Sequence, residues 1–194
     1  PLAVPSGPFV VAENGRPIAH QVDASGAKPE IWIRTSIPAG ESRTYTLRPG
    51  NPAAASSLVR VRRETGSVIL DNGAVALRLP DGSDPAAAPV LGVKPAGAGE
   101  WLGRGVWRTA LKPVKLEVSV PGDGRLFGKV RLFYRFEGGN PDTGAWARID
   151  VRLDPDQAFA TIEESHAMGR RDAWEFDCAA GWKPTRSLYK THGS

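Results

Sequence analysis

Short runs in which apolar and polar residues alternate are the dominant pattern of this chain. In the longest run, residues 126–136, every second position is apolar or glycine. The positions between them, which include Lys129, Arg131 and Arg135, belong to the opposite face. A strand of this kind has one side on a core and the other toward solvent. Residues 126–136 are therefore predicted to form a long central strand.

Similar runs predict the neighbours of this strand. Residues 114–120 alternate before a turn at 121–124, and residues 146–153 alternate after a hairpin loop at 137–144. The segment Asp71-Asn72-Gly73 predicts a hairpin with a type I′ turn, because Asn and Gly both tolerate positive φ angles. Shorter strands are expected at residues 9–12, 18–22, 30–34, 43–48, 58–62, 67–70, 74–79, 159–165 and 173–178.

Turn-forming and small residues set the expected domain organisation. The 22 Gly and 17 Pro residues interrupt the pattern at intervals of roughly 8–12 residues, and only residues 165–171 suggest a turn or two of helix. Because residues 52–57 form a small-residue linker, we expect a small N-terminal β unit over 1–52. An antiparallel β-sandwich, not necessarily complete, is expected over 58–194. The predicted fold class is all-β, with a small β-barrel or sandwich unit followed by a larger antiparallel β-sandwich.

Composition and charge narrow the functional classes. With 194 residues the chain can bury a core without covalent staples, and its single cysteine, Cys178, permits neither an intrachain disulfide nor a cysteine-rich metal site. No apolar run reaches the roughly 20 residues that span a bilayer, and residues 1–8 lack the features of a signal peptide. The net charge of +4 is spread along the chain. Neither nucleic acid nor a membrane is therefore an expected partner.

The polar face of the predicted sheet is the first candidate site. Arg131 and Arg135 on the central strand, with Arg148 and Arg152 on the next strand, fall on one surface. Arginine pairs with carboxylates through two parallel hydrogen bonds, and Trp146 on the same face can stack on a sugar ring. This pattern is typical of a surface that grips an acidic polysaccharide. The alternative is a solvated face in which these arginines pair with neighbouring acidic residues.

The second candidate site is the only segment where acidic residues, a histidine and arginines crowd together. Glu164 and His166 share a strand face, and Arg170 and Arg171 follow closely. A carboxylate beside an imidazole can serve general acid–base chemistry if burial separates their pKa values. The alternative is the end of a strand and a polar loop. The other two histidines have no metal-ligand spacing to His166, so no metal site is expected.

Six tryptophans are many for a chain of this length. Trp101 and Trp107 lie in or beside the glycine-rich stretch 92–105, which suits a loop site for sugar stacking, although a large β core also uses tryptophan. No nucleophile elbow, phosphate loop, zinc signature or dinucleotide fingerprint is present. Enzymes that depend on those motifs are therefore not expected, and no cofactor is predicted.

Three segments carry a resemblance to a known family. They are NGRPIAHQV at 14–22, IPAGESRTYTL at 37–47 and ETGSVILDNGAVALRL at 64–79. In their order they resemble the N-terminal region of the exo-rhamnogalacturonan lyase-like proteins of bacteria and fungi. Residues 115–178 are similar to the β-sandwich of mutarotase-like and polysaccharide lyase proteins.

The resemblance implies a small β-barrel domain before a large β-sandwich, within a longer secreted or periplasmic protein that degrades polysaccharides. It assigns no catalytic residue to this chain. The predicted function is a non-catalytic or accessory module that binds acidic plant or algal polysaccharide. Two alternatives stay open: a lyase that uses His166, Glu164 and Arg170 or Arg171 on a uronate, and a structural or cell-surface interaction module.

Overall fold

The computed structural model describes residues 4–52, 56–138, 144–169 and 171–178, and within these ranges the chain is all-β. No helix occurs among the described residues, so none that could span a membrane is present there. The prediction of an antiparallel all-β fold is confirmed. The strands are β1 Phe9–Glu13, β2 Arg16–Ile18, β3 His20–Asp23, β4 Glu30–Ile33, β5 Tyr45–Pro49, β6 Arg60–Glu64, β7 Ser67–Asp71, β8 Val75–Pro80, β9 Gly92–Pro95, β10 Arg104–Arg108, β11 Lys112–Asp123, β12 Gly128–Glu137, β13 Ala145–Leu153, β14 Ala160–His166 and β15 Ala173–Asp177.

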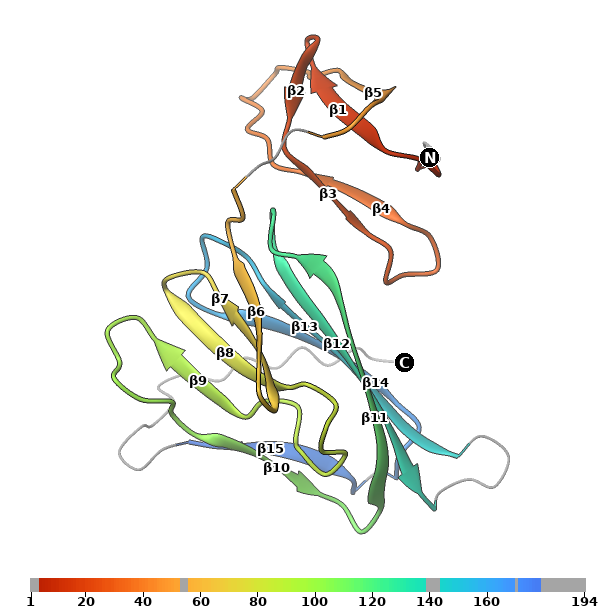
Figure 1. Ribbon diagram of the computed structural model, residues 1–194, viewed down its shortest axis with the longest axis vertical. Helices are drawn as coiled ribbons and strands as arrows, with labels where there is room; N and C mark the ends of the chain where they lie inside the picture. The colour runs from red at the N-terminus through yellow and green to blue at the C-terminus, as the bar shows by residue number, and fades with distance from the viewer. Residues whose placement is uncertain (1–3, 53–55, 139–143, 170, 179–194) are drawn as a thin grey trace.

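Two four-stranded antiparallel sheets form the larger body, which is sandwich-like in architecture (Figure 1). One sheet has the order β11-β12-β13-β14, and the other has the order β6-β7-β8-β9. Strands β10 and β15 pair with each other at the foot of this body. The buried core between the sheets includes Val68, Leu70, Leu77, Leu79, Val130, Leu132, Ile149 and Val151. Full burial of each such side chain contributes roughly 1.5–3 kcal/mol, which makes this the main source of stability.

The central strand β12 alternates as its sequence predicts. Val130, Leu132 and Tyr134 are fully buried, whereas Arg135 on the other face is exposed. Burial raises the pKa of Tyr134, and its phenol donates a hydrogen bond of 2.9 Å to the carbonyl oxygen of Ala87. The buried hydroxyl is therefore satisfied, and one sheet face is left free for polar side chains.

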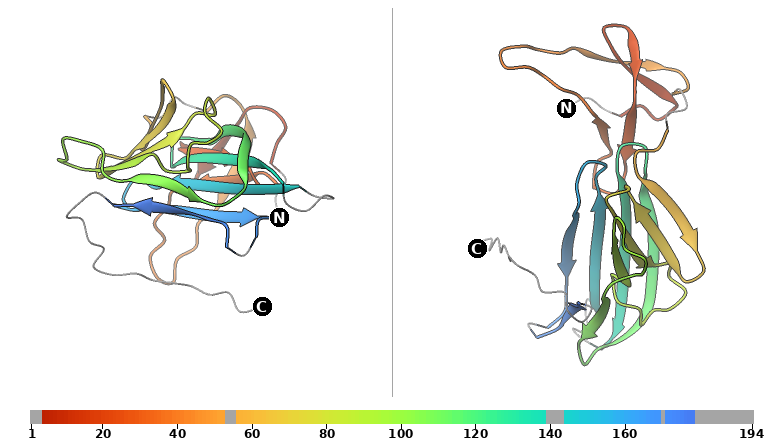
Figure 2. Two further views of the ribbon diagram at one scale, coloured as in Figure 1. Left: turned by 90° about the horizontal axis from the view of Figure 1, so that it is seen from below. Right: turned by 90° about the vertical axis from the view of Figure 1, so that its left-hand side faces the viewer.

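The N-terminal strands pair only among themselves, in a three-stranded sheet β2-β1-β5 and a two-stranded sheet β3-β4. No sheet of the described residues closes into a barrel. Asn14 and Gly15 join β1 to β2 with φ angles of 50° and 80°, the signs that a type I′ turn requires. The right-hand view of Figure 2 places these strands at one end of an elongated molecule. The division of the chain near residues 52–58 stays a prediction.

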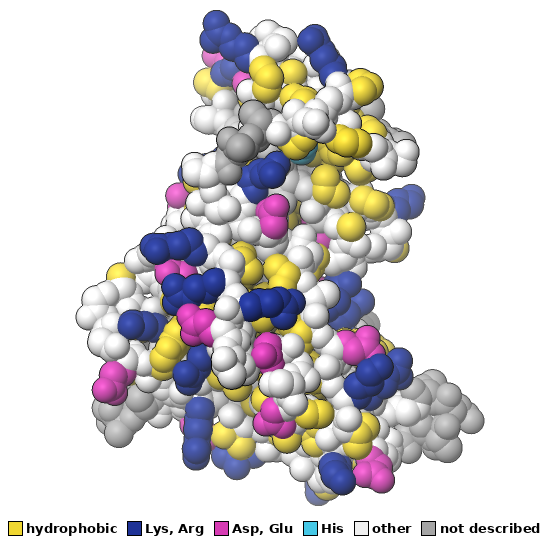
Figure 3. All heavy atoms as spheres, in the orientation of Figure 1, with side chains coloured by type: hydrophobic (Ala, Val, Ile, Leu, Met, Phe, Trp, Pro, Cys, Tyr) yellow, Lys and Arg dark blue, Asp and Glu magenta, His cyan; other side chains and the backbone are white. Residues whose placement is uncertain are grey.

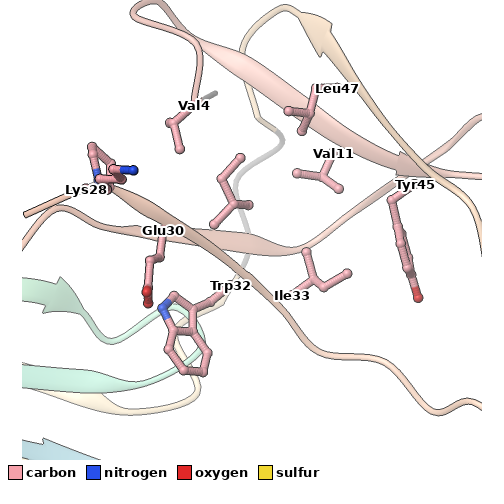
Figure 4. Close-up of a pocket in the computed structure, with 10 residues that line it drawn as sticks. Val4, Val11, Lys28, Glu30, Trp32, Ile33, Tyr45 and Leu47 are labelled. Atoms are coloured by element: carbon pink, nitrogen blue, oxygen red, sulfur yellow. The ribbon is translucent and has the colours of Figure 1, made fainter. Parts of the chain in front are cut away.

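An apolar groove of about 940 Å³ separates the two small sheets. Val11, Ile33 and Leu47 line it, and Figure 4 shows these side chains converging from both sheets. Hydrophobic side chains also gather on this part of the surface in Figure 3, whereas basic and acidic side chains are interspersed over the larger body.

The hairpin β3-β4 joins the N-terminal strands to the sandwich. The buried side chain of Gln21 donates to the carbonyl oxygen of Phe127 at 2.9 Å and accepts from the backbone N–H groups of Leu126 and Phe127 at 2.6 and 3.2 Å. These backbone groups immediately precede β12. An ion pair between Arg34 and Asp156 adds a second connection.

The Asn72-Gly73 turn differs from the type I′ turn that was predicted. Gly73 has a φ of +86°, but Asn72 is not in the positive-φ region. Its side-chain oxygen instead accepts from the N–H groups of Ala74 and Val75, and its amide nitrogen donates to the carbonyls of Asp154 and Gln157, each at 2.7 Å. These contacts with the β13–β14 turn override the preference of the Asn-Gly pair for a type I′ turn.

Two further expectations are wrong. The glycine-rich stretch 92–105 was expected to suit a loop site, yet it contains β9 and the start of β10. At Gly105 a Cβ atom would lie 2.5 Å from the carbonyl oxygen of Val90, so the glycine permits the close approach of β10 to the segment before β9 and does not mark a loop. None of the described residues in 165–171 is helical, because β14 continues to His166 and residues 167–169 and 171 follow it without helical structure.

Replacement of Gln21 by alanine tests how much the contact between the β3–β4 hairpin and the sandwich stabilises the fold. We expect Gln21→Ala to lower the free energy of unfolding by about 2 kcal/mol or more, because the buried N–H groups of Leu126 and Phe127 lose their partner and the Phe127 carbonyl keeps only the Gly124 N–H. Urea denaturation measures this loss. Arg63→Ala, at an exposed side chain of β6 with no partner among the described residues, should change stability by less than about 0.5 kcal/mol. Equal effects of the two substitutions would contradict the assigned role.

Candidate functional site

The outer face of the sheet β11-β12-β13-β14 brings together most of the predicted binding residues. The facing pairs between β12 and β13 on this side are Lys129–Arg152, Arg131–Asp150, Phe133–Arg148 and Arg135–Trp146. Strand β14 adds Glu163 opposite Asp150 and Thr161 opposite Arg152. The predicted convergence of these arginines on one surface therefore occurs, but their partners differ from one arginine to the next.

Arg131 is held by an internal ion pair. Its guanidinium donates to both carboxylate oxygens of Asp150 at 2.6 Å, and it also donates to the backbone carbonyl of Ser25. The hydrogen bonds that Arg131 donates to the Asp150 carboxylate raise the pKa of Arg131 despite partial burial. Asp150 is buried, so this fork supports the sheet face and the β3–β4 loop and is not open to a ligand carboxylate.

Arg152 is also committed within the protein. It donates to the Asp154 carboxylate at 2.8 Å. Its guanidinium lies 4.2 Å from the ring centre of Trp32 and 4.0 Å from that of Phe127. Cation–π contacts of this kind stabilise a folded protein by about 0.5–2 kcal/mol. Arg152 therefore strengthens the joint between the N-terminal strands and the sandwich.

Arg148 and Arg135 are the two predicted arginines that keep their hydrogen-bonding groups free. Arg148 is exposed and has no hydrogen-bond or ion-pair partner among the described residues. Arg135 is exposed, and its guanidinium lies 5.1 Å from the centre of the Phe133 ring. Both groups can therefore pair with a ligand.

Phe133 and Trp146 form an aromatic pair on this face. Their ring centres are 5.9 Å apart, and their planes are inclined by 23°. Both side chains are partly exposed, and Arg148 lies directly opposite Phe133. The pair presents two nearly parallel apolar surfaces beside a free cation, which suits stacking against a flat ligand.

A polar groove continues from Arg148 toward the β3–β4 loop. It has a volume of about 290 Å³, and four carboxylates and three cationic groups line it. The charged residues are Asp23, Glu30, Asp150, Glu163, Lys129, Arg131 and Arg148. Because the charges nearly balance, the groove as a whole is not a cationic site, and recognition of an acidic group falls to the individual free arginine.

Asp23 and Lys129 lie where the polar groove meets the contact between the β3–β4 hairpin and the sandwich. The ammonium of Lys129 donates to Asp23 at 2.9 Å and to the hydroxyl of Ser25 at 2.8 Å. Burial alone would raise the pKa of Asp23, but hydrogen bonds from Ser25 and Lys129 outweigh burial, and the pKa lies below its ordinary value. Asp23 is therefore ionised and fixes the β3–β4 loop on the sheet.

The residues of the predicted acid–base site lie elsewhere. Glu164 and His166 alternate with the outer-face residues of β14 and so belong to its opposite side. The indole of Trp174 donates to Glu164 at 3.4 Å, and the Nδ1 atom of His166 accepts from the backbone of Met168 at 3.4 Å. Arg171 is exposed without a partner among the described residues, and Arg170 lies outside them. No group of metal-ligating side chains occurs in the described part of the chain.

The two tryptophans of the glycine-rich stretch serve packing. Trp107 lies in β10 with its ring edge-on to Tyr134 and Phe136, at 4.9 and 5.2 Å, and its indole donates to the Ala87 carbonyl. Trp101 packs under Arg78, whose guanidinium is 5.2 Å from the ring. Neither side chain lies on the sheet face that carries Trp146.

Comparison with known proteins returns no relative of this chain. No protein-family model, curated protein or solved structure matches it. The resemblance to exo-rhamnogalacturonan lyase-like proteins therefore stays a prediction that rests on short sequence segments. Any assignment of function depends on the geometry of the sheet face itself.

Several groove residues were not predicted from the sequence. Asp23, Ser25 and Glu30 come from the β3–β4 hairpin, roughly a hundred positions before the strands that they meet. The Trp-containing segment 24–32 carried no local signal for this placement, because its role depends on how the two sets of strands pack together.

Acidification should weaken the Asp23 anchor. The pKa of Asp23 is lowered in the folded protein, so its contribution to stability is present above the unfolded value of about 3.9 and is lost as pH falls through the folded value. We expect the Asp23→Asn variant to have a lower free energy of unfolding than the wild type at pH 7. Between pH 5 and pH 3, its free energy of unfolding should fall less than that of the wild type. Urea denaturation at pH 7, 5 and 3 checks this. Glu100→Gln, at an exposed carboxylate, should follow the wild-type profile.

Proposed function

We propose that this chain is a carbohydrate-binding module whose ligand lies along the outer face of the sheet β11-β12-β13-β14. The observation that carries the proposal is the adjacency of the Phe133–Trp146 aromatic pair, the free Arg148 and the polar groove on one surface. Sugar rings combine an apolar face with polar edges. A surface that offers stacking beside hydrogen-bonding groups is complementary to both.

The two free arginines define the acidic part of the proposed ligand. Arg135 and Arg148 lie on either side of the aromatic pair in the strand register. A uronate ring stacked on Trp146 would bring its carboxylate within reach of one of them, and a charge-assisted hydrogen bond of this kind contributes roughly 1.5–3 kcal/mol. The proposed ligand is therefore a polysaccharide that contains uronate, bound by Arg135 and Arg148 and not by the internally paired Arg131 and Arg152.

The two parts of the chain act together in this proposal. The small N-terminal unit over residues 1–52 supplies one wall of the groove, and the larger sandwich over 58–194 supplies the sheet face. We propose that both belong to a secreted or periplasmic polysaccharide-degrading protein as a non-catalytic unit. The strongest structural support is that the groove takes lining residues from both parts of the chain.

Binding to immobilised polysaccharides tests the proposal. Against a panel of acidic and neutral polysaccharides, the wild type should be retained by at least one uronate-containing polymer. We expect Arg148→Ala and Trp146→Ala each to weaken that retention at least about tenfold, because each removes a group that faces the ligand. Affinity electrophoresis gives the dissociation constants.

Arg63→Ala serves as the matched control, because it removes an exposed arginine from β6 in the other sheet. It should leave binding unchanged, and thermal melting should show that all variants are folded. Absence of retention by every polymer would overturn the proposal and favour a structural or cell-surface interaction module. A rise in ultraviolet absorbance from unsaturated uronate products would indicate a lyase in place of a binding module.

A further inference from the structure

A small cavity of about 180 Å³ lies where β4 faces the sheet β12-β13-β14. Side chains from both parts of the chain line it, among them Glu30, Trp32, Lys129, Arg152, Thr161 and Glu163. Its volume is that of about six water molecules, which is enough space for a single sugar ring. Glu30, Lys129 and Glu163 also line the polar groove, so the cavity is continuous with the proposed binding face.

The indole nitrogen of Trp32 is a buried donor without a hydrogen-bond partner. Such orphan donors are rare in proteins, and each costs roughly 1–3 kcal/mol. The ring itself is well held, because it contacts Phe127 edge-on at 5.5 Å and carries Arg152 over its face. Trp32 and Glu30 line both the apolar groove and the small cavity, and Figure 4 shows the indole nitrogen on the same side of β4 as the Glu30 carboxylate.

Three of the acceptors around the cavity are free, whereas Asp23, Asp150 and both cations are paired within the protein. Glu30, Glu163 and the hydroxyl of Thr161 form no hydrogen bond or ion pair with another described residue. Lys129 is bound to Asp23, and Arg152 is bound to Asp154. A ligand carboxylate would therefore meet two unpaired carboxylates and no available cation, which makes this cavity unfavourable for a uronate.

A hydroxyl group satisfies both kinds of unpaired atom, because it accepts from an N–H donor and donates to a carboxylate. We infer that this cavity is a subsite for a neutral sugar unit. The Trp32 Nε1–H donates to one sugar hydroxyl, and Glu163 or Glu30 accepts from a neighbouring one. The inference rests on the proposed carbohydrate-binding function and adds to it that the ligand presents a neutral unit beside the uronate held by Arg148.

Trp32→Phe removes the N–H group and keeps an aromatic ring beside Arg152. Because the donor has no partner in the free protein, the melting temperature should not fall by more than about 2 °C, and loss of the orphan donor can raise it. Calorimetric titrations use a neutral hexose oligosaccharide and an all-uronate oligosaccharide as separate probes. We expect Trp32→Phe and Glu163→Gln each to weaken the neutral probe about 5- to 10-fold and to leave the uronate probe unchanged. Arg148→Ala should show the opposite selectivity.

The outcomes separate this inference from the proposed function. If the wild type binds neither probe, both fail. If it binds only the uronate probe, or if Trp32→Phe binds the neutral probe as well as the wild type does, the neutral subsite fails and the binding module stands. An equal loss for both probes, or a fall of more than about 5 °C in melting temperature, would assign Trp32 to structure and overturn the subsite.

Discussion

The docking of the β3–β4 hairpin on the start of β12 is the contact on which the candidate site depends. Gln21 satisfies buried backbone groups, Asp23 pairs with Lys129, and Trp32 stacks on the Arg152 guanidinium. Without this hairpin, the outer face of the sheet β11-β12-β13-β14 would be a plain solvent-exposed surface. With the hairpin in place, the face gains a wall, a groove and a small cavity. The joint therefore turns an ordinary solvated surface into a concave one.

Charge neutralisation within the protein decides which residues are left for recognition. Arg131 and Arg152 look equivalent to Arg148 in a strand pattern, but their guanidinium groups already bind Asp150 and Asp154. Breaking such partly buried pairs for a ligand costs more than the ligand returns. Recognition is thus concentrated in the groups without internal partners, and these are divided between the exposed aromatic pair with its arginines and the smaller cavity with its carboxylates.

The sequence predicts the parts of this fold that depend on local pattern. Alternation located β12 and β13 and assigned their faces, because side-chain direction has a period of two in any strand. Local pattern failed at Gly105, where glycine reflects a close contact with the backbone of Val90, and at Asn72, where hydrogen bonds to a distant turn override the preference for a type I′ turn. The groove was not predictable, since its walls lie about a hundred residues apart and the free or paired state of each arginine depends on neighbours across the sheet.

The position of the ligand on the outer face is the central claim, and the nitrogen-15 spectrum of the indole N–H groups tests it most directly. During titration with a polysaccharide that the protein retains, the signals of Trp146 and Trp32 should shift. The signal of Trp107, whose N–H is bound to the Ala87 carbonyl in the core, should stay in place. Unmoved Trp146 and Trp32 signals with bound ligand, or a largest shift at Trp107, would contradict the account.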